Sequence, residues 1–120
     1  LVIRGNTFAI GTGDPTQSIW MRNEVVDTGR AGSSMFYQRV TIEDNVIVNG
    51  QRNGIAVGET AGLTIRSNSV LRSDGGNVDG ADTPVEIPLI NVASRSTGVT
   101  ITQNATAGIG GYDGQAGWTV

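Results

Sequence analysis

The chain contains no cysteine, no histidine and no lysine. Without cysteine and histidine it can build no disulfide framework, no thiolate or imidazole metal site, and no Ser-His or Cys-His catalytic pair. All eight basic residues are arginine, they are scattered among 11 acidic residues, and the net charge is −3. A nucleic-acid groove needs a clustered basic stripe with aromatic residues for stacking, so nucleic acid is not an expected partner.

Long apolar runs and helical periodicity are also missing. No run approaches the length of a membrane span, and no signal-peptide pattern stands at the start. No segment shows a sustained 3.6-residue periodicity, and 18 glycines in 120 residues make long helices costly. We therefore expect a single domain, residues 1–120, that contains neither helices nor a membrane span.

One short pattern is present four times. An apolar residue, a variable residue, isoleucine, two polar residues and asparagine recur at residues 1–6, 40–45, 63–68 and 99–104. The pattern is typical of a strand that buries one face and ends in a turn, and its recurrence indicates a stacked repeat. The four asparagines are 39, 23 and 36 residues apart. The middle spacing is about one turn of a parallel β-helix, and the outer two correspond to one turn plus an inserted loop.

The repeats predict an all-β solenoid, a parallel β-helix of about four to five coils, with inserted loops at about 11–34 and 73–87. Side chains alternate between the two faces of a strand, so the first and third positions of each repeat should point inward. One inward column would contain Leu1, Val40, Leu63 and Val99, and the other Ile3, Ile42, Ile65 and Ile101. The intervening Val2, Thr41, Thr64 and Thr100 would point outward. Residues 59–62 are expected to form a turn.

An antiparallel fold is the alternative. Asn49-Gly50 and Asn53-Gly54 lie between apolar runs, and Asn-Gly favours a hairpin, as in a small β-sandwich. A sandwich gives no reason for the repeat to recur in register. We therefore interpret these glycines as corners of the coil where the backbone needs a positive φ.

The Val/Leu-Thr-Ile-x-x-Asn repeats of residues 40–73 and 99–104 resemble the right-handed parallel β-helix superfamily, which includes pectate lyases, polygalacturonases, mannuronan epimerases and bacteriophage tailspikes. The resemblance implies a right-handed solenoid, acidic or other extended polysaccharides as ligands, and a location outside the cell or on a cell or virion surface. It also implies a structural role as a ladder of stacked amides, and not a sugar contact, for Asn6, Asn45, Asn68 and Asn104. The repeated residues are buried and corner residues, so no catalytic residue is transferred.

The segment 73–82 holds the candidate catalytic residues. Asn77-Val-Asp79-Gly80-Ala-Asp82 resembles the Asn-Thr-Asp-Gly-x-Asp motif of polygalacturonases, in which paired carboxylates act as general acid and base. Asp79 and Asp82 are therefore candidates, and Asp113 is the nearest equivalent of a pair one coil later. The remaining parts of that motif set, a second Asp pair, a histidine and an Arg-x-Lys, are missing. We expect this segment to be non-catalytic; an enzymatic parent would be a polysaccharide lyase, hydrolase or epimerase.

The same loop is a candidate calcium site. Asp74, Asn77, Asp79 and Asp82 could supply oxygen ligands to Ca²⁺. The spacing does not match an Asp-x-Asn-x-Asp-Gly loop, because Gly75 stands where the first aspartate should be. The alternative is a solvated loop without an ion.

The first insertion holds a candidate carbohydrate site. Trp20 could stack on a sugar ring while Arg22 and Glu24 hydrogen-bond to its hydroxyls. In the alternative, Ile19, Met21 and Val25 pack inward and Trp20 points outward, either exposed or covered by residues 29–34. The exposure of Trp20 decides between them.

Two function classes follow from these patterns. One is a carbohydrate-acting or carbohydrate-binding module, and the other is a structural or adhesive β-helix such as a phage tailspike, a fibre or a stacked surface filament. Neither Leu1–Ile3 nor Gly117–Val120 resembles the cap that closes a solenoid. We therefore expect further coils or copies of the chain at the open ends, and a longer parent polypeptide.

Overall fold

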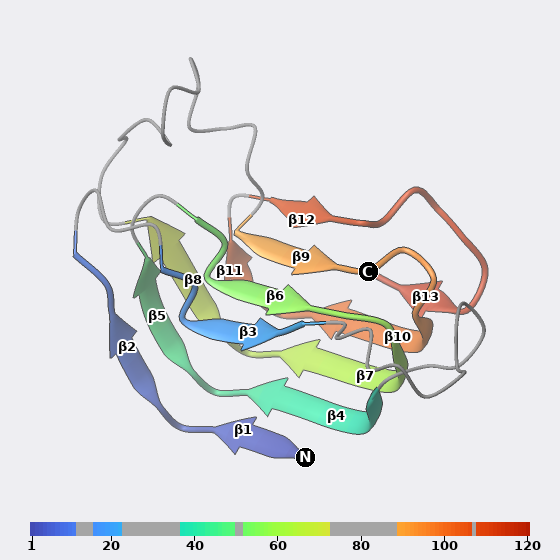
Figure 1. Ribbon diagram of the computed structural model, residues 1–120, viewed down its shortest axis with the longest axis horizontal. Helices are drawn as coiled ribbons and strands as arrows, with labels where there is room; N and C mark the ends of the chain where they lie inside the picture. The colour runs from blue at the N-terminus through green and yellow to red at the C-terminus, as the bar shows by residue number, and fades with distance from the viewer. Residues whose placement is uncertain (12–15, 23–36, 50–51, 73–88, 107) are drawn as a thin grey trace.

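The computed structural model describes residues 1–11, 16–22, 37–49, 52–72, 89–106 and 108–120 (Figure 1). In these ranges all regular secondary structure is strand. The prediction of an all-β chain is therefore confirmed for this part of the molecule. A search of the same residues for a helix long and apolar enough to span a membrane finds none.

Three sheets run side by side through the molecule (Figure 1). The first sheet contains, in spatial order, β1 (Val2–Arg4), β4 (Tyr37–Glu43), β7 (Thr60–Arg66), β10 (Thr97–Thr102) and β13 (Trp118–Thr119). The second sheet contains β11 (Ala105–Thr106), β8 (Ser69–Arg72), β5 (Val46–Asn49) and β2 (Thr7–Ala9). The third sheet contains β12 (Ile109–Gly110), β9 (Ile90–Val92), β6 (Ile55–Val57) and β3 (Ile19–Met21).

The chain visits the three sheets in turn. Apart from the outermost strands, each strand pairs in parallel with the strands three places before and after it in chain order. This winding is that of a solenoid, as the repeats predict. The alternative hairpin between residues 45–49 and 54–58 does not form, because β5 pairs with β2 and β8, whereas β6 pairs with β3 and β9.

The two inward columns of the first sheet are in the predicted register. Ile3, Ile42, Ile65 and Ile101 stand side by side, as do Val40, Leu63 and Val99. All of them except the partly buried Ile3 are buried in one continuous core, together with Ile47 and Val70 of the second sheet and Ile55, Val57, Ile90 and Val92 of the third. Leu1 is an exception to the prediction. It lies directly before the outermost β1 and is 65% exposed.

The outward column of the first sheet also follows the prediction. Val2, Thr41, Thr64 and Thr100 are aligned in register, and Thr119 extends the row. None of the five is fully buried. Threonine suits this position because its branched side chain fits a pleated, hydrated surface.

The corner between the first and second sheets depends on left-handed backbone. The residue just before each repeat asparagine has a positive φ: 67° at Gly5, 55° at Asp44, 55° at Ser67 and 57° at Gln103. Residues other than glycine adopt this conformation at an energetic cost, and short polar side chains tolerate it best. The repetition of the same φ in four places shows that the asparagine corner has one conserved backbone shape within this chain.

The predicted turn at residues 59–62 is wrong, because residues 60–62 lie inside β7. Gly62 has φ 78° and is aligned with Gly98, φ 59°, in β10 and with Arg39, φ 52°, in β4. In each strand, one residue with left-handed backbone produces a bend at the same register position, and the strand pairing continues on both sides of it. Gly62 therefore marks a bend that recurs in neighbouring strands, and not a loop.

The predicted positive φ at Gly54 is also wrong. Gly54 is buried and is not among the residues with left-handed backbone. A Cβ atom built on it would lie 2.5 Å from Cγ1 of Val70 and 3.1 Å from Cγ2 of Ile47. Glycine is required here by the close approach of core side chains. Gly50, the other predicted corner, lies outside the described residues.

The two predicted insertions have different outcomes. β3 lies within the segment 11–34 and is a regular strand of the third sheet. Residues 73–87 fall outside the part of the chain that the structure describes.

Candidate functional site

Trp20 lies on the outer face of the third sheet. On β3 the flanking Ile19 and Met21 are buried, whereas Trp20 is 59% exposed. Alternation along the strand places residue i+2 on the same face, so Arg22 follows Trp20 outward. The arrangement of Ile19 and Met21 matches the alternative interpretation of this segment, and the exposure of the indole leaves its ring accessible to a ligand.

The neighbours of Trp20 along the sheet have small side chains. In register, Trp20 stands beside Ala56 of β6, and Ala56 stands beside Asn91 of β9. Gly58 and Ala93 follow directly after these two strands, and their N–H groups donate to Met21 and Val57 respectively, at 2.6 and 2.9 Å. Small residues beside a large aromatic ring leave a depression on the sheet surface.

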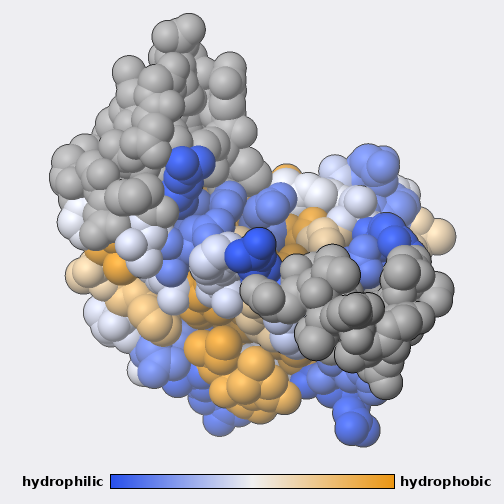
Figure 2. Space-filling view, in the orientation of Figure 1, coloured by the Kyte–Doolittle hydropathy of each residue, from blue (hydrophilic) through white to orange (hydrophobic). Residues whose placement is uncertain are grey.

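This depression is an open groove of about 310 Å³. It crosses three successive strands of the third sheet, and Figure 2 shows mixed polar and apolar surface where Figure 1 places β3, β6 and β9. Ligand pockets typically have a volume of about 300–1,000 Å³, so the groove is at the small end of that range. Its lining residues are Gln17, Trp20, Met21, Arg22, Asn53, Ala56, Val57, Gly58, Asn91 and Ala93.

The polar side chains of the groove are amides and one guanidinium. Nε2 of Gln17 donates to Oδ1 of Asn53 at 3.1 Å, which ties the segment before β3 to the segment before β6. Asn91 is exposed. Among the described lining residues there is no Asp or Glu, so this part of the groove has hydrogen-bonding groups but no acid–base pair of the kind that glycosidic cleavage needs.

Arg22 is in contact with Trp20 at the edge of the groove. Its guanidinium carbon lies 5.7 Å from the centroid of the indole ring, within the range of a cation–π interaction. The hydroxyl of Tyr37, at the start of β4, donates to the backbone carbonyl of Arg22. This bond anchors the main chain of Arg22 while its side chain extends over the indole.

The predicted site residues are thus brought together in part. Trp20 and Arg22 share one face and line one groove, whereas Glu24 lies outside the described residues. Sequence reasoning missed Gln17, Asn53 and Asn91. Only Asn91 had a local signal, because it stands between two buried residues, Ile90 and Val92, and must therefore point outward.

The predicted catalytic and metal-binding residues are not assembled in what the structure describes. Asp74, Asn77, Asp79 and Asp82 fall outside the described residues. Asp113 is exposed in a turn after β12, where its backbone N–H donates to Oε1 of Gln115 at 2.8 Å. Within the described residues, no three His, Cys, Asp or Glu side chains gather closely enough to hold a metal ion.

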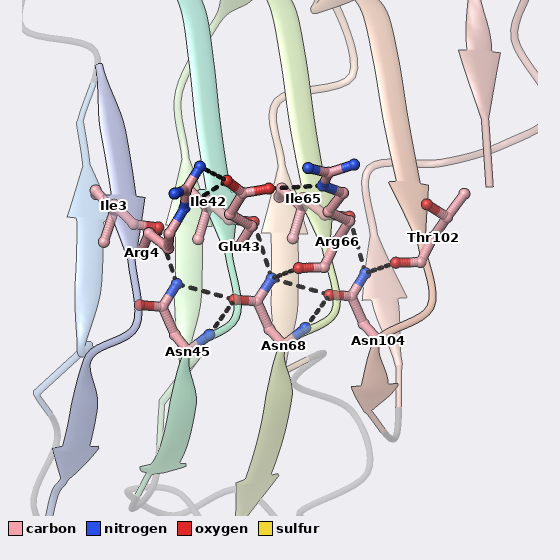
Figure 3. A network of polar contacts seen from close by, with 10 residues as sticks. All are labelled: Ile3, Arg4, Ile42, Glu43, Asn45, Ile65, Arg66, Asn68, Thr102 and Asn104. Atoms are coloured by element: carbon pink, nitrogen blue, oxygen red, sulfur yellow. Dashed lines mark hydrogen bonds and ion pairs between the residues drawn. The ribbon is translucent and has the colours of Figure 1, made fainter.

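The repeat asparagines form a hydrogen-bonded row at the corner between the first and second sheets, and Figure 3 shows Asn45, Asn68 and Asn104 of this row. Nδ2 of Asn6 donates to Oδ1 of Asn45 at 3.1 Å, Nδ2 of Asn45 to Oδ1 of Asn68 at 2.9 Å, and Nδ2 of Asn68 to Oδ1 of Asn104 at 2.9 Å. The backbone N–H of Asn6, Asn45 and Asn68 donates to the same oxygens. Asn45 and Asn68 are buried, so their amides face the corner backbone and each other.

A charged row that sequence reasoning missed lies beside the asparagines (Figure 3). The carboxylate of Glu43 is 3% exposed and is held by Arg4 on one side and Arg66 on the other. Nε of Arg4 donates to Oε1 at 2.7 Å, and Nε of Arg66 donates to Oε2 at 2.6 Å. The hydrogen bonds from Arg66 and Arg4 hold the pKa of the Glu43 carboxyl below its usual range. The three residues are in register on β1, β4 and β7.

Comparison with known proteins gives no relative. No protein-family model, curated protein or solved structure matches this chain.

Proposed function

We propose that this chain is a carbohydrate-binding module built on a right-handed parallel β-helix of about four to five coils, and that it belongs to the pectate-lyase-like superfamily. A polysaccharide binds in the groove over β3, β6 and β9, and Trp20 is its main contact. The segment itself is non-catalytic. The observation that carries the proposal is the exposed indole of Trp20 beside a groove lined with small residues and amides.

The groove has the composition that sugar recognition needs. An indole offers a large, flat apolar surface for the face of a sugar ring, and it is rigid, so little entropy is lost on contact. Side-chain amides such as those of Gln17, Asn53 and Asn91 both donate and accept hydrogen bonds, as hydroxyl groups do. The groove spans three strands in succession, which suits an extended chain of sugars better than a small compact ligand.

We propose that the protein is located outside the cell or on a cell or virion surface, because polysaccharides are presented there. The segment 73–87, with Asp74, Asn77, Asp79 and Asp82, stays a candidate for calcium, and Asp79, Asp82 and Asp113 are the residues to substitute first if the chain is found to cleave a polysaccharide.

Trp20→Ala tests the proposed function. The 120-residue chain is titrated by calorimetry with polygalacturonate, alginate and hyaluronan, and with the carboxyl-reduced neutral derivative of each. Loss of the stacked ring should weaken binding at least about tenfold, corresponding to about 1.4 kcal/mol. Trp20→Phe, which keeps an aromatic surface, should lose less. Equal affinity of the wild type and Trp20→Ala, or no binding to any of these polysaccharides, would rule the function out.

A second candidate function is a structural or adhesive β-helix. The observation that favours it is the apolar surface at the start of the chain, where Leu1 and Val2, the first residue of β1, are among the most exposed large hydrophobic residues described. Figure 2 shows this surface in orange at the lower edge, where Figure 1 places β1. Further coils or a second copy of the chain packed against β1 would cover it. Sedimentation velocity over a concentration series tests this: self-association supports the candidate, and a strictly monomeric chain at high concentration counts against stacking of copies.

A further inference from the structure

Asn91 differs from the other amides that line the groove. Nε2 of Gln17 donates to Oδ1 of Asn53 at 3.1 Å, so these two side chains already share a hydrogen bond. Asn91 is exposed, and among the residues that the structure describes its side-chain amide has no hydrogen-bond partner. Its carbonyl oxygen and both of its N–H donors are therefore available to a ligand.

The main chain holds Asn91 in a fixed position. The flanking Ile90 and Val92 are 0% and 1% exposed, and β9 pairs with β6 on one side and with β12 on the other. The N–H of Ala93, directly after the strand, donates to the carbonyl of Val57 at 2.9 Å. Because the backbone is fixed and the asparagine side chain is short, a contact with this amide costs little conformational entropy.

The neighbours of Asn91 along the sheet leave its amide accessible. In register it stands between Ala56 of β6 and Gly110 of β12, a methyl group on one side and no side chain on the other. Trp20 lies on the far side of Ala56, two strands from Asn91, which is about 10 Å at the usual strand spacing. A saccharide stacked on the indole can thus extend over Ala56 and bring the hydroxyl groups at its edge to Asn91.

A primary amide matches two neighbouring hydroxyl groups. It presents an acceptor and a donor side by side in one plane, and a hydroxyl group can both donate and accept. One hydroxyl can therefore donate to Oδ1 while the adjacent one accepts from Nδ2. Acetyl groups on these hydroxyls remove their donors, so Oδ1 would be covered by the ligand without a donor to replace water, which is unfavourable.

We infer that Asn91 is a specificity-determining residue of the groove and selects saccharides with two free neighbouring hydroxyls over those in which these hydroxyls are substituted. The inference rests on the proposed function, since it assumes that the saccharide stacks on Trp20. The two residues have separate roles: Trp20 supplies affinity through the face of a sugar ring, and Asn91 distinguishes the pattern of substitution at its edge. This selection does not depend on the charge of the saccharide.

The test compares Asn91→Leu with the wild type by calorimetry on matched ligands. The probes are polygalacturonate and alginate, whose sugar units carry two free neighbouring hydroxyls, each against its O-acetylated derivative. The wild type should bind the free form of at least one pair about tenfold or more tightly than the acetylated form. Asn91→Leu keeps a side chain of similar size without hydrogen-bonding groups, and it should lose this preference through weaker binding to the free form. Asn91→Thr, which has one hydroxyl, should be intermediate.

Gln38→Leu is the matched control. It removes an amide from an exposed position of β4, outside the groove, and should keep the wild-type preference. The inference is overturned if the wild type binds both forms of each pair equally, if Asn91→Leu weakens both forms alike, or if Gln38→Leu has the same effect as Asn91→Leu. In each of these cases binding that still depends on Trp20 leaves the proposed function standing, whereas binding that survives Trp20→Ala removes both.

Discussion

The two outermost strands of the first sheet differ sharply in burial. Leu1, directly before β1, is 65% exposed and Val2 of β1 is 60% exposed, but Trp118 of β13 is only 8% exposed. The indole N–H of Trp118 donates to the carbonyl of Ser96 at 2.7 Å, and the ring of Tyr112 stacks on it at a centroid distance of 5.9 Å. Each strand has one neighbour in the sheet, so an outermost position does not by itself decide exposure.

The difference lies in the side chain that each strand places over the core. Trp118 is the register partner of Val99 and is large enough to cover the end of the inward column, with Tyr112 against it. Leu1, at the other end of the same column, is not part of the buried core. Trp118 is therefore part of the core although its strand is an outermost one.

Trp118→Ala should produce the largest effect. Removal of a buried tryptophan side chain typically costs about 3–5 kcal/mol, because it leaves a cavity and, here, an unpaired carbonyl at Ser96. Trp20→Ala is the control within the same chain. Since Trp20 is mostly exposed, its loss should cost less than about 1 kcal/mol. Urea denaturation of both variants measures the difference, and equal losses would contradict the assignment of Trp118 to the core.

The asparagine row offers a second comparison, between a buried and an exposed position of the same kind. Asn68 donates from Nδ2 to the carbonyls of Ile42 and Arg66 as well as to Asn104, and it accepts from Asn45. Asn6 is exposed and lies at one end of the row.

Asn68→Ala should therefore destabilise far more than Asn6→Ala. Buried groups that lose a partner cost about 1–3 kcal/mol each, so we expect a total on the order of 3 kcal/mol for Asn68→Ala, and under about 1 kcal/mol for Asn6→Ala. Thermal and urea denaturation give both values. If Asn68→Ala unfolds like the wild type but no longer binds a polysaccharide, the row is a binding site and not a structural ladder.

Glu43 ties the outermost β1 to β4 and β7 through Arg4 and Arg66, so it should stabilise the first coil in a pH-dependent way. Its pKa is lowered in the folded chain. The ion pairs therefore stabilise fully above the unfolded-state pKa of about 4.3 and are lost as the pH falls through the folded-state value. We expect the difference in melting temperature between the wild type and Glu43→Gln to be constant near neutral pH and to shrink in acid. A difference that does not change with pH would mean that the carboxylate is not charged in the folded chain.

The sequence was sufficient to predict much of the fold. The all-β solenoid, the register of the isoleucine column and the outward threonines all follow from one recurring pattern, because that pattern records burial and strand alternation directly. The aligned bend at Arg39, Gly62, Gly98 and Gly117 was missed, since its first member is not glycine. Gly54 was misinterpreted because an Asn-Gly pair signals a turn, whereas the tight packing against Val70 appears only once the coils are stacked.

The candidate groove was predictable only in part. Trp20 and Arg22 stand out as an aromatic and a charged residue at spacing i, i+2 between buried positions. Asn53, just before β6, and Asn91, on β9, are 33 and 71 residues after Trp20. They reach the same groove only because β3, β6 and β9 are neighbours in one sheet, which the local sequence does not reveal. The ion pairs of Glu43 also depend on register between strands, which no local pattern encodes.

Val2→Thr should have the smallest effect. Val2 occupies the position that threonine fills at residues 41, 64, 100 and 119, and its exposed side chain loses little by exchange for a residue of the same shape. In the isolated monomer we expect a change within about 0.5 kcal/mol. A loss above about 1 kcal/mol, growing with protein concentration, would instead show that a second copy covers β1 in solution, because burial on association makes stability concentration-dependent. Urea denaturation at two protein concentrations thus separates an open first coil from one that is covered by a neighbouring molecule.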